Sequence, residues 1–545
     1  MKPEEQKLFD RIRAGIPKPC RAAFIACIIA GFLAHLFAFT NIVPNSDGLS
    51  RVFDEQQMTV SGRWFLHYAS MFHGYVQAPM LIGTLSVFFL AVAAALAVDA
   101  LKLRGSLAGV LCGIFMVVFP SVAYIYMFVF TASAYTFGIL LAVLAVWLCR
   151  RCPKAFLAAA IPLACAVGTY QAYFAVAASL ALCCVIRDLL DPERKLRDAF
   201  GRAVRLLGML AAGAVVYYLV LRLFLWAKDL TLLSYRGMDS FGSSLTLTGI
   251  LAGVWDTYKQ FLRYFLVPGS SSYVTVPLIA GQLLLFAAGA GALVQLVVRG
   301  GLLRQPGRLT LLLLAWALLP LALNFTQLLS NSSPVMRYSL VFAWILPVTL
   351  LDRVSGKWEL RLKASACVAG ALLVLLSAQI ANTAYTASAT AHRATQAFAT
   401  NLVSRVESLS GYRKNMEVVV IGAFPEDVYY NGVEGLALAE HKNSCLSSSV
   451  MPLNKHIYYY LNDWLNVPWE EPEEAAMIAV SESEEFQNMP LYPSDGSVAI
   501  IDGRVVVRLA ETYTPKKDYE IAYENRRLVI LLFNKTCDFI RRAAL

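Results

Sequence analysis

Long apolar runs alternate with short polar segments through the first 385 residues of the chain. A helix that crosses a membrane needs about twenty mostly apolar residues, and by this measure the pattern predicts about eleven spans. The predicted spans are 22–43, 78–98, 106–124, 131–149, 155–168, 172–186, 203–226, 277–298, 309–329, 339–351 and 364–385.

Residues 155–186 allow two interpretations, a single long tilted helix or two short helices. Basic segments flank both ends of this stretch, which favours a hairpin. Its tip is then the sequence Thr-Tyr-Gln-Ala-Tyr at positions 169–173.

Basic side chains gather in the connections at 102–104, 150–154, 187–205, 299–308 and 353–363. These connections fall on one side of the membrane if the N-terminus is cytoplasmic, as the positive-inside rule expects. The segments 41–77, 123–130, 228–275 and 331–337, and everything after about residue 386, then lie on the extracytoplasmic side. We therefore expect a multi-pass protein of the cell membrane.

The composition changes after residue 385. A helix is predicted over 391–409, and β-branched runs at 418–422, 498–507 and 528–533 predict strands. Asp502-Gly503 stands between two such runs and is typical of a two-residue β-hairpin. The predicted fold is mainly α: a transmembrane helical bundle of residues 1–385, followed by a small extracytoplasmic α/β domain of residues 386–545.

Composition supports the membrane assignment, since 58% of the 545 residues are hydrophobic and only 15% are charged. The net charge of +10 comes from basic residues between apolar runs, where they set topology. No basic patch with interleaved aromatic residues is present, so we do not expect nucleic-acid binding. The polar segment 1–21 precedes a full-length span and indicates a membrane anchor, not a cleaved signal.

The first extracytoplasmic segment holds the most concentrated polarity of the chain. It contains Asp47, Asp54, Glu55 and Arg63, and Trp64 opens an amphipathic stretch over 64–75 that would lie along the membrane surface. A carboxylate there can deprotonate a sugar hydroxyl, and an arginine can hold a phosphate by two charge-assisted hydrogen bonds. The alternatives are a solvated connecting loop and, for Arg63, an interface anchor.

Three further residues stand near the extracytoplasmic ends of spans. Tyr170 and Gln171 at the hairpin tip are candidates for substrate contact or for helix-terminal hydrogen bonding, and Arg337 is placed to face a lipid phosphate. His35, inside the first span, is predicted to pack in the interior. The chain has no His/Cys cluster with metal-ligand spacing, no Walker or dinucleotide glycine pattern and no Gly-x-Ser-x-Gly elbow. We expect an activated donor to arrive through the lipid phase.

Ser46-Asp47-Gly48 followed by Ser61-Gly62-Arg63-Trp64 resembles the opening of bacterial membrane glucosyltransferases of the O-antigen-modifying type. The hairpin tip, and segments 124–135, 382–385 and 492–496, resemble that family too. The family often has an aromatic cluster before the Gly-Arg pair, where this chain has Gln-Met-Thr-Val. The resemblance implies a GT-C-like bundle with its active site at the outer membrane face, and a polyprenyl-phosphate-linked sugar as donor.

The resulting hypothesis is an inverting glycosyltransferase, specifically a glucosyltransferase, that modifies a cell-surface glycan. Asp47 is its general base, while Arg63 and Arg337 hold the leaving phosphate. Asp54 and Glu55 orient the acceptor or bind a divalent ion; no other cofactor is expected. The alternatives are a transporter or flippase of lipid-linked glycans, and a membrane scaffold that presents its outer domain.

Two cysteines, Cys445 and Cys537, follow residue 385 and are expected outside the cytoplasm. That side of the membrane permits disulfides in many bacteria. A bridge between them and two separate buried thiols are both open.

Overall fold

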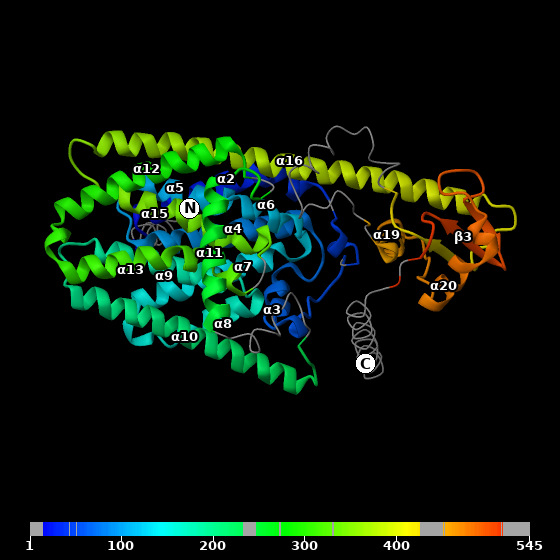
Figure 1. The fold of residues 1–545 in the computed structure, drawn as a ribbon, viewed down its shortest axis with the longest axis horizontal. Coiled ribbons are helices and arrows are strands. Elements are labelled where there is room, and N and C mark those ends of the chain that lie inside the picture. The colour runs from blue at the N-terminus through cyan, green and yellow to red at the C-terminus, as the bar shows by residue number, and fades with distance from the viewer. Residues whose placement is uncertain are drawn as a thin grey trace, which may run out of the picture. The chain divides into compact units, whose positions relative to one another are not determined.

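The computed structural model describes residues 15–42, 44–50, 52–232, 247–271, 274–329, 332–425, 451, 453–513 and 515. The described residues form two compact units, one that extends to His392 and one that begins at Arg393. The first unit is helical (Figure 1). Its helices are α2 (Lys18–Thr40), α3 (Leu66–Ser70), α4 (Pro79–Leu101), α5 (Ser106–Val118), α6 (Pro120–Met127), α7 (Val129–Arg151), α8 (Ala160–Thr169), α9 (Tyr173–Leu189), α10 (Leu196–Ala227), α11 (Leu247–Leu266), α12 (Val276–Arg299), α13 (Pro306–Leu323), α14 (Phe325–Leu329), α15 (Val341–Leu351) and α16 (Glu359–Glu407), with short 3-10 turns η1 (Ser46–Gly48), η2 (Thr59–Ser61), η3 (Met71–His73), η4 (Pro153–Ala155), η6 (Leu302–Arg304) and η7 (Pro334–Leu340).

Within the described ranges, nine helical segments are long and apolar enough to cross a membrane. Two of them are composite, α5 with α6 and η7 with α15. The shorter helices α8 and α9 account for the two remaining expected spans, so each predicted span coincides with a helical segment. The chain is a mostly helical, multi-pass membrane protein.

The α8–α9 pair is the predicted hairpin. Its tip, residues 170–172, separates the two helices and lies beside the first polar segment, because Gln171 Nε2 donates to the Ser61 carbonyl over 2.8 Å. At the other end of α9, Asp188 pairs with Arg150 of α7. We call the end of the bundle with the tip and residues 44–77 the loop end, and the end with Asp188 the basic end.

A proline break between α5 and α6 organises the middle of the bundle. Phe119 is extended (ψ 134°), and Pro120 has no N–H to donate to the Met116 carbonyl. The hydroxyl of Tyr338 donates to that carbonyl at 2.8 Å, and His35 Nε2 donates to the Val117 carbonyl at 2.8 Å. Because a carbonyl only accepts, Nδ1 of His35 accepts from the Tyr385 hydroxyl, 2.7 Å away. His35 is buried as predicted, and it binds the carbonyl next to the one that the proline leaves without a helical donor.

Two elements differ from the predicted connections. Residues 228–275 were expected as an extracytoplasmic loop, but α11 occupies Leu247–Leu266 and packs against α13 and α14. Its apolar residues fall on one face, while Lys259 and Arg263 are exposed. The last span and the helix predicted over 391–409 form one continuous helix, α16, since no Pro or Gly interrupts residues 371–407.

The second unit contains a three-stranded sheet in the order β1 (Val418–Ile421), β3 (Arg504–Arg508), β2 (Val498–Ile501). β1 pairs with β3 in parallel, and β2 with β3 antiparallel. Asp502 and Gly503 both have positive φ, 48° and 75°, which confirms the predicted hairpin turn. Helices α19 (Asn454–Leu465), α20 (Glu474–Glu482) and α21 (Glu484–Gln487) complete the unit. The strand predicted at 528–533, Cys445 and Cys537 lie outside the described residues.

Candidate active site

The first polar segment folds back on itself at the loop end. Its two sides are joined where Asp54 N donates to the Tyr75 carbonyl at 3.0 Å and Gln77 N to the Val52 carbonyl at 2.9 Å. The segment is therefore an ordered cap in the part that the structure describes, not only a solvated connection.

Asp47 lies in the first turn of η1, which the side chain of Asn45 holds in place. The Asn45 side chain accepts from Gly48 N at 2.8 Å and donates to the Met127 carbonyl, the last residue of α6, at 2.8 Å. Gly48 is buried against Phe130 of α7, and a Cβ on Gly48 would lie 3.1 Å from that ring. The Asp47 carboxylate itself is exposed and makes no hydrogen bond or ion pair with the described residues.

Gly62 is the point at which the cap meets the bundle. Its φ of +79° is left-handed, and a Cβ there would lie 2.5 Å from Gln171 Nε2 and 2.8 Å from the Tyr217 hydroxyl. These two groups hold the neighbouring carbonyls: Gln171 binds Ser61, and Tyr217 of α10 donates to Gly62 O at 3.1 Å. Only glycine fits this turn, which aims the next side chain, Arg63, at the bundle.

Arg63 is held among tyrosines. Its Nη1 donates to the Tyr135 hydroxyl of α7 at 3.2 Å, and its guanidinium lies 4.7 Å from the centre of the Tyr170 ring. Tyr135 and Tyr170 stack on each other, with centroids 4.8 Å apart and ring planes 9° apart. A cation over an aromatic face is stabilised by the ring quadrupole. The stack therefore fixes a positive charge at the loop end.

Trp64 points the other way and is buried. Its ring stacks on Phe224 of α10 at 5.7 Å and packs on Gly168, whose Cβ would lie 2.6 Å from the indole. Phe65 N donates to the Gly168 carbonyl at 2.8 Å. Trp64 is a packing residue that joins the cap to the hairpin, and the surface-lying stretch expected over 64–75 is short, comprising α3 and η3, with Tyr68, Met71 and Phe72 exposed.

The adjacent carboxylates Asp54 and Glu55 serve the cap. Asp54 accepts from Gln56 N at 2.8 Å, and Glu55 accepts from Gln57 Nε2 at 2.9 Å. Partial burial, and then the nearby Glu55 carboxylate, raise the pKa of Tyr75. Across the described ranges, no group of three or more His, Cys, Asp or Glu side chains gathers that could hold a metal ion. Both carboxylates therefore help to order the cap.

Arg337 lies in η7, which packs against α6 and α9. Its Nε and Nη2 donate to the hydroxyl and carbonyl of Ser332 at 3.0 and 2.9 Å. Ser332 in turn donates to Gln327, which donates to Asp256 of α11 at 3.0 Å. Two of the five N–H donors of Arg337 are thus occupied, and Nη1 makes no hydrogen bond with the residues that the structure describes.

The segments that carry Asp47, Arg63 and Arg337 all contact α6 or the start of α7. Asn45, two residues before Asp47, binds the end of α6, η7 with Arg337 packs on α6, and Arg63 binds Tyr135. The segment with Asp47 packs on Phe130, and Arg63 bonds to Tyr135. These two residues of α7 are about 7.5 Å apart along the helix axis. Sequence reasoning missed Tyr135 and Tyr217; the available signal was a tyrosine just inside the end of an apolar run.

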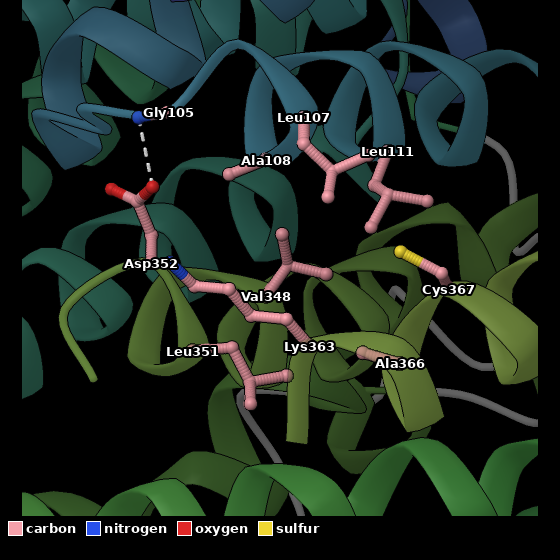
Figure 2. Close-up of a pocket in the computed structure, with 10 residues that line it drawn as sticks. All are labelled: Gly105, Leu107, Ala108, Leu111, Val348, Leu351, Asp352, Lys363, Ala366 and Cys367. Atoms are coloured by element: carbon pink, nitrogen blue, oxygen red, sulfur yellow. Dashed lines mark hydrogen bonds between the residues drawn. The ribbon is translucent and has the colours of Figure 1, made fainter. Parts of the chain in front are cut away.

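A small pocket elsewhere contains none of these residues. Figure 2 shows it at the basic end, where Asp352 accepts from Gly105 N at 2.8 Å and leucines of α5 and α15 form the walls. This aspartate caps the start of α5. The pocket is a packing gap between α5, α15 and α16, and we do not assign the chemistry to it.

One family model, that of the glucosyl transferase GtrII, matches residues 36–395, which is more than half of the chain. The chain belongs to this family. The matched range contains Asp47, Arg63, Arg337 and helices α3 to α15, so the cap and its partners belong to the glucosyltransferase part of the chain. Membership favours a transferase over the transporter and scaffold alternatives. No curated protein and no solved structure matches the chain.

Proposed function

We propose that this membrane glucosyltransferase transfers glucose from a polyprenyl-phosphate donor to a cell-surface glycan at the outer membrane face. The observation that carries the proposal is the fixed guanidinium of Arg63, held over Tyr170 beside the segment that bears the exposed Asp47. A cation and a base at the membrane boundary suit a substrate with a phosphate head and a lipid tail. The apolar helices offer the tail a place without any nucleotide-binding motif.

The reaction is a single displacement. Asp47 takes the proton of the acceptor hydroxyl while that oxygen bonds to the anomeric carbon, and the bond from this carbon to the phosphate oxygen breaks. The bonding electrons stay on the departing polyprenyl phosphate, which needs no protonating acid. One base therefore suffices, and the anomeric centre inverts.

The departing phosphate gains negative charge, which prepositioned cations stabilise. Arg63 and Arg337 supply these cations. The Nη1–Nη2 edge of Arg337 matches two phosphate oxygens, because the guanidinium fork binds in a bidentate manner. The edge formed by Nε and Nη2 is anchored on Ser332, so the side chain loses little conformational entropy when it binds phosphate.

The remaining candidates take supporting roles. Tyr170 offers an aromatic edge beside the phosphate, and Asp54 and Glu55 orient the acceptor. Gln171 and Trp64 act through the cap: one holds the Ser61 carbonyl and the other fills the gap at Gly168. They are positioning residues.

The test compares three variants in vesicles that contain polyprenyl-phosphate-[14C]glucose and native glycans. Asp47→Asn keeps the volume of an exposed side chain, so folding and insertion should not change. Loss of a general base should lower transfer by roughly two to four powers of ten. Asp54→Asn and Glu55→Gln should be affected much less.

Normal transfer by Asp47→Asn with an inactive Asp54→Asn or Glu55→Gln would move the base along the cap. Full activity of all three variants would remove the cap from catalysis. Transfer from UDP-glucose but not from the lipid-linked sugar would refute the donor class.

A further inference from the structure

The basic end of the bundle contains two aspartates, Asp188 and Asp191. The arginines around them carry more positive charge than these two carboxylates can neutralise. Asp188 is 1% exposed, and both of its oxygens bind Arg150, at 3.1 and 3.2 Å. Arg353 is 3.4 Å from Asp191. The other arginines in ion pairs with these two carboxylates are Arg187, Arg194 and Arg202.

The first turns of α10 add a hollow to this cluster. Arg197, Asp198, Gly201, Arg202 and Arg205 line it. Arg197 and Arg205 stand one helical turn to either side of Gly201, on the same face, and neither makes an ion pair with the described residues. A Cβ at Gly201 would have no atom within 4 Å, so the floor of the hollow is open.

Arg202 joins the hollow to the buried cluster. It reaches Asp188 only at 3.8 Å and shares it with three other arginines, and 36% of its side chain is exposed. Seven arginines face three aspartates when the hollow and the ion pairs are taken together, an excess of four positive charges. Burial, and after it the nearby guanidiniums, lower the pKa of Lys102.

An apolar stripe lies on the same turns of α10. Phe200, Val204 and Leu207 follow each other at helical spacing, and they are 53%, 50% and 67% exposed. α10 runs along the edge of the helical bundle in Figure 1, and the protein leaves about half or more of each of these side chains uncovered. The helix thus combines a cationic hollow with an apolar flank at one level.

We propose that the hollow over Gly201 binds the phosphate headgroup of an anionic phospholipid, whose acyl chains lie along Phe200, Val204 and Leu207. The excess charge selects an anion, because basic groups between transmembrane helices attract anionic headgroups. The first turn of α10 adds the positive end of a helix dipole, and Lys195 at its N-cap makes no side-chain cap. The apolar flank favours a lipid over a free phosphate, which would use only the arginines.

The test is native mass spectrometry of the full chain in mixed micelles with phosphatidylglycerol and phosphatidylcholine at equal concentration. Wild type should retain phosphatidylglycerol preferentially. Each of Arg197→Gln, Arg202→Gln and Arg205→Gln should reduce that preference about five-fold, since one basic group near an anionic headgroup contributes about that factor. Arg151→Gln is the matched control, because Arg151 is exposed at the end of α7 and does not line the hollow.

Gly201→Leu separates a defined site from diffuse attraction. It fills the floor, leaves every charge in place and should fold normally, since the position is open and helical. We expect it to abolish the preference. Retention of phosphatidylglycerol by Gly201→Leu, or an equal loss in Arg151→Gln, would overturn the proposal. So would competition by inorganic phosphate at micromolar concentration, which would mark a free-anion site.

Discussion

Gly62→Ala is the substitution that most directly tests how the cap aims Arg63. The left-handed φ of +79° should cost about 1–2 kcal/mol for any residue with a Cβ. The new methyl group must also displace Gln171 Nε2 and the Tyr217 hydroxyl, which would otherwise lie at 2.5 and 2.8 Å. Their hydrogen bonds to Ser61 and Gly62 contribute about 1 kcal/mol each. The total is about 3–4 kcal/mol, all of it at the contact between the cap and the bundle.

The expected consequence is a misplaced guanidinium. A displacement of about 1 Å at a reacting group can cost about a hundredfold in rate, so we expect kcat/KM for sugar transfer to fall by about that factor. The assay is transfer from polyprenyl-phosphate-[14C]glucose in vesicles, together with thermal unfolding in detergent. The Tm should fall by only a few degrees, because a cost of a few kcal/mol is small beside the unfolding enthalpy of a chain of this size.

Gly74→Ala is the matched control in the same cap. Gly74 also has a positive φ, +66°, but a Cβ there would have no atom within 4 Å. It therefore carries the backbone cost without the collision, and we expect less than a tenfold loss of transfer. If the two variants lose activity equally, the contacts of Gln171 and Tyr217 do not position Arg63 and the reasoning fails.

Two further predictions concern Arg337 and His73. Arg337→Lys keeps the charge but loses the fork, so we expect about a tenfold higher KM for the donor with unchanged insertion. Burial lowers the pKa of His73 to about 4, and Nδ1 lies 2.8 Å from the Ser133 hydroxyl. The unfolded chain, in which the pKa is ordinary, takes up a proton first, so stability should fall as the pH drops from about 6.5 towards 4. His73→Gln should remove that part of the loss, measured as the change in Tm between pH 7.5 and pH 5.

Each of these two has a clear opposing result. Arg222→Lys changes an exposed arginine near the end of α10 and controls for the general effect of the exchange; equal kinetics in Arg337→Lys and Arg222→Lys would make Arg337 an anchor. An unchanged acid-side loss of Tm in His73→Gln would show that other groups cause it.

The spans were predictable because hydrophobic length is a local property of the sequence. The Asp502-Gly503 turn was predictable for the same reason, since two residues decide the backbone there. The extent of α16 was not, because the composition changes near residue 385 while the helical hydrogen bonds continue to Glu407. α11 was not predicted because its charged residues, Asp256, Lys259 and Arg263, interrupt the run of apolar residues along the sequence. The apolar residues nevertheless fall on one face of the helix.

The candidate site was predictable in its parts but not in its connections. Asp47, Arg63 and Tyr170 stand out as polar residues near the ends of apolar runs, but the contact between Arg63 and Tyr170 spans more than a hundred residues. Gln171 illustrates the limit: the sequence offered substrate contact or helix-end bonding, whereas the side chain holds the carbonyl of Ser61 in another segment. Such pairs follow from helix packing, which no local pattern encodes.

The proline break has a consequence for how the enzyme can vary. One carbonyl before the break, Met116, is bound by Tyr338, the neighbour of Arg337, and the last carbonyl of α6, Met127, is bound by Asn45, near Asp47. α6 therefore works as a spacer between the proposed base and the proposed phosphate ligand. Substitutions at its buried positions would change the distance between the two proposed groups without altering either one. Acceptor preference can therefore change through residues that never contact a sugar.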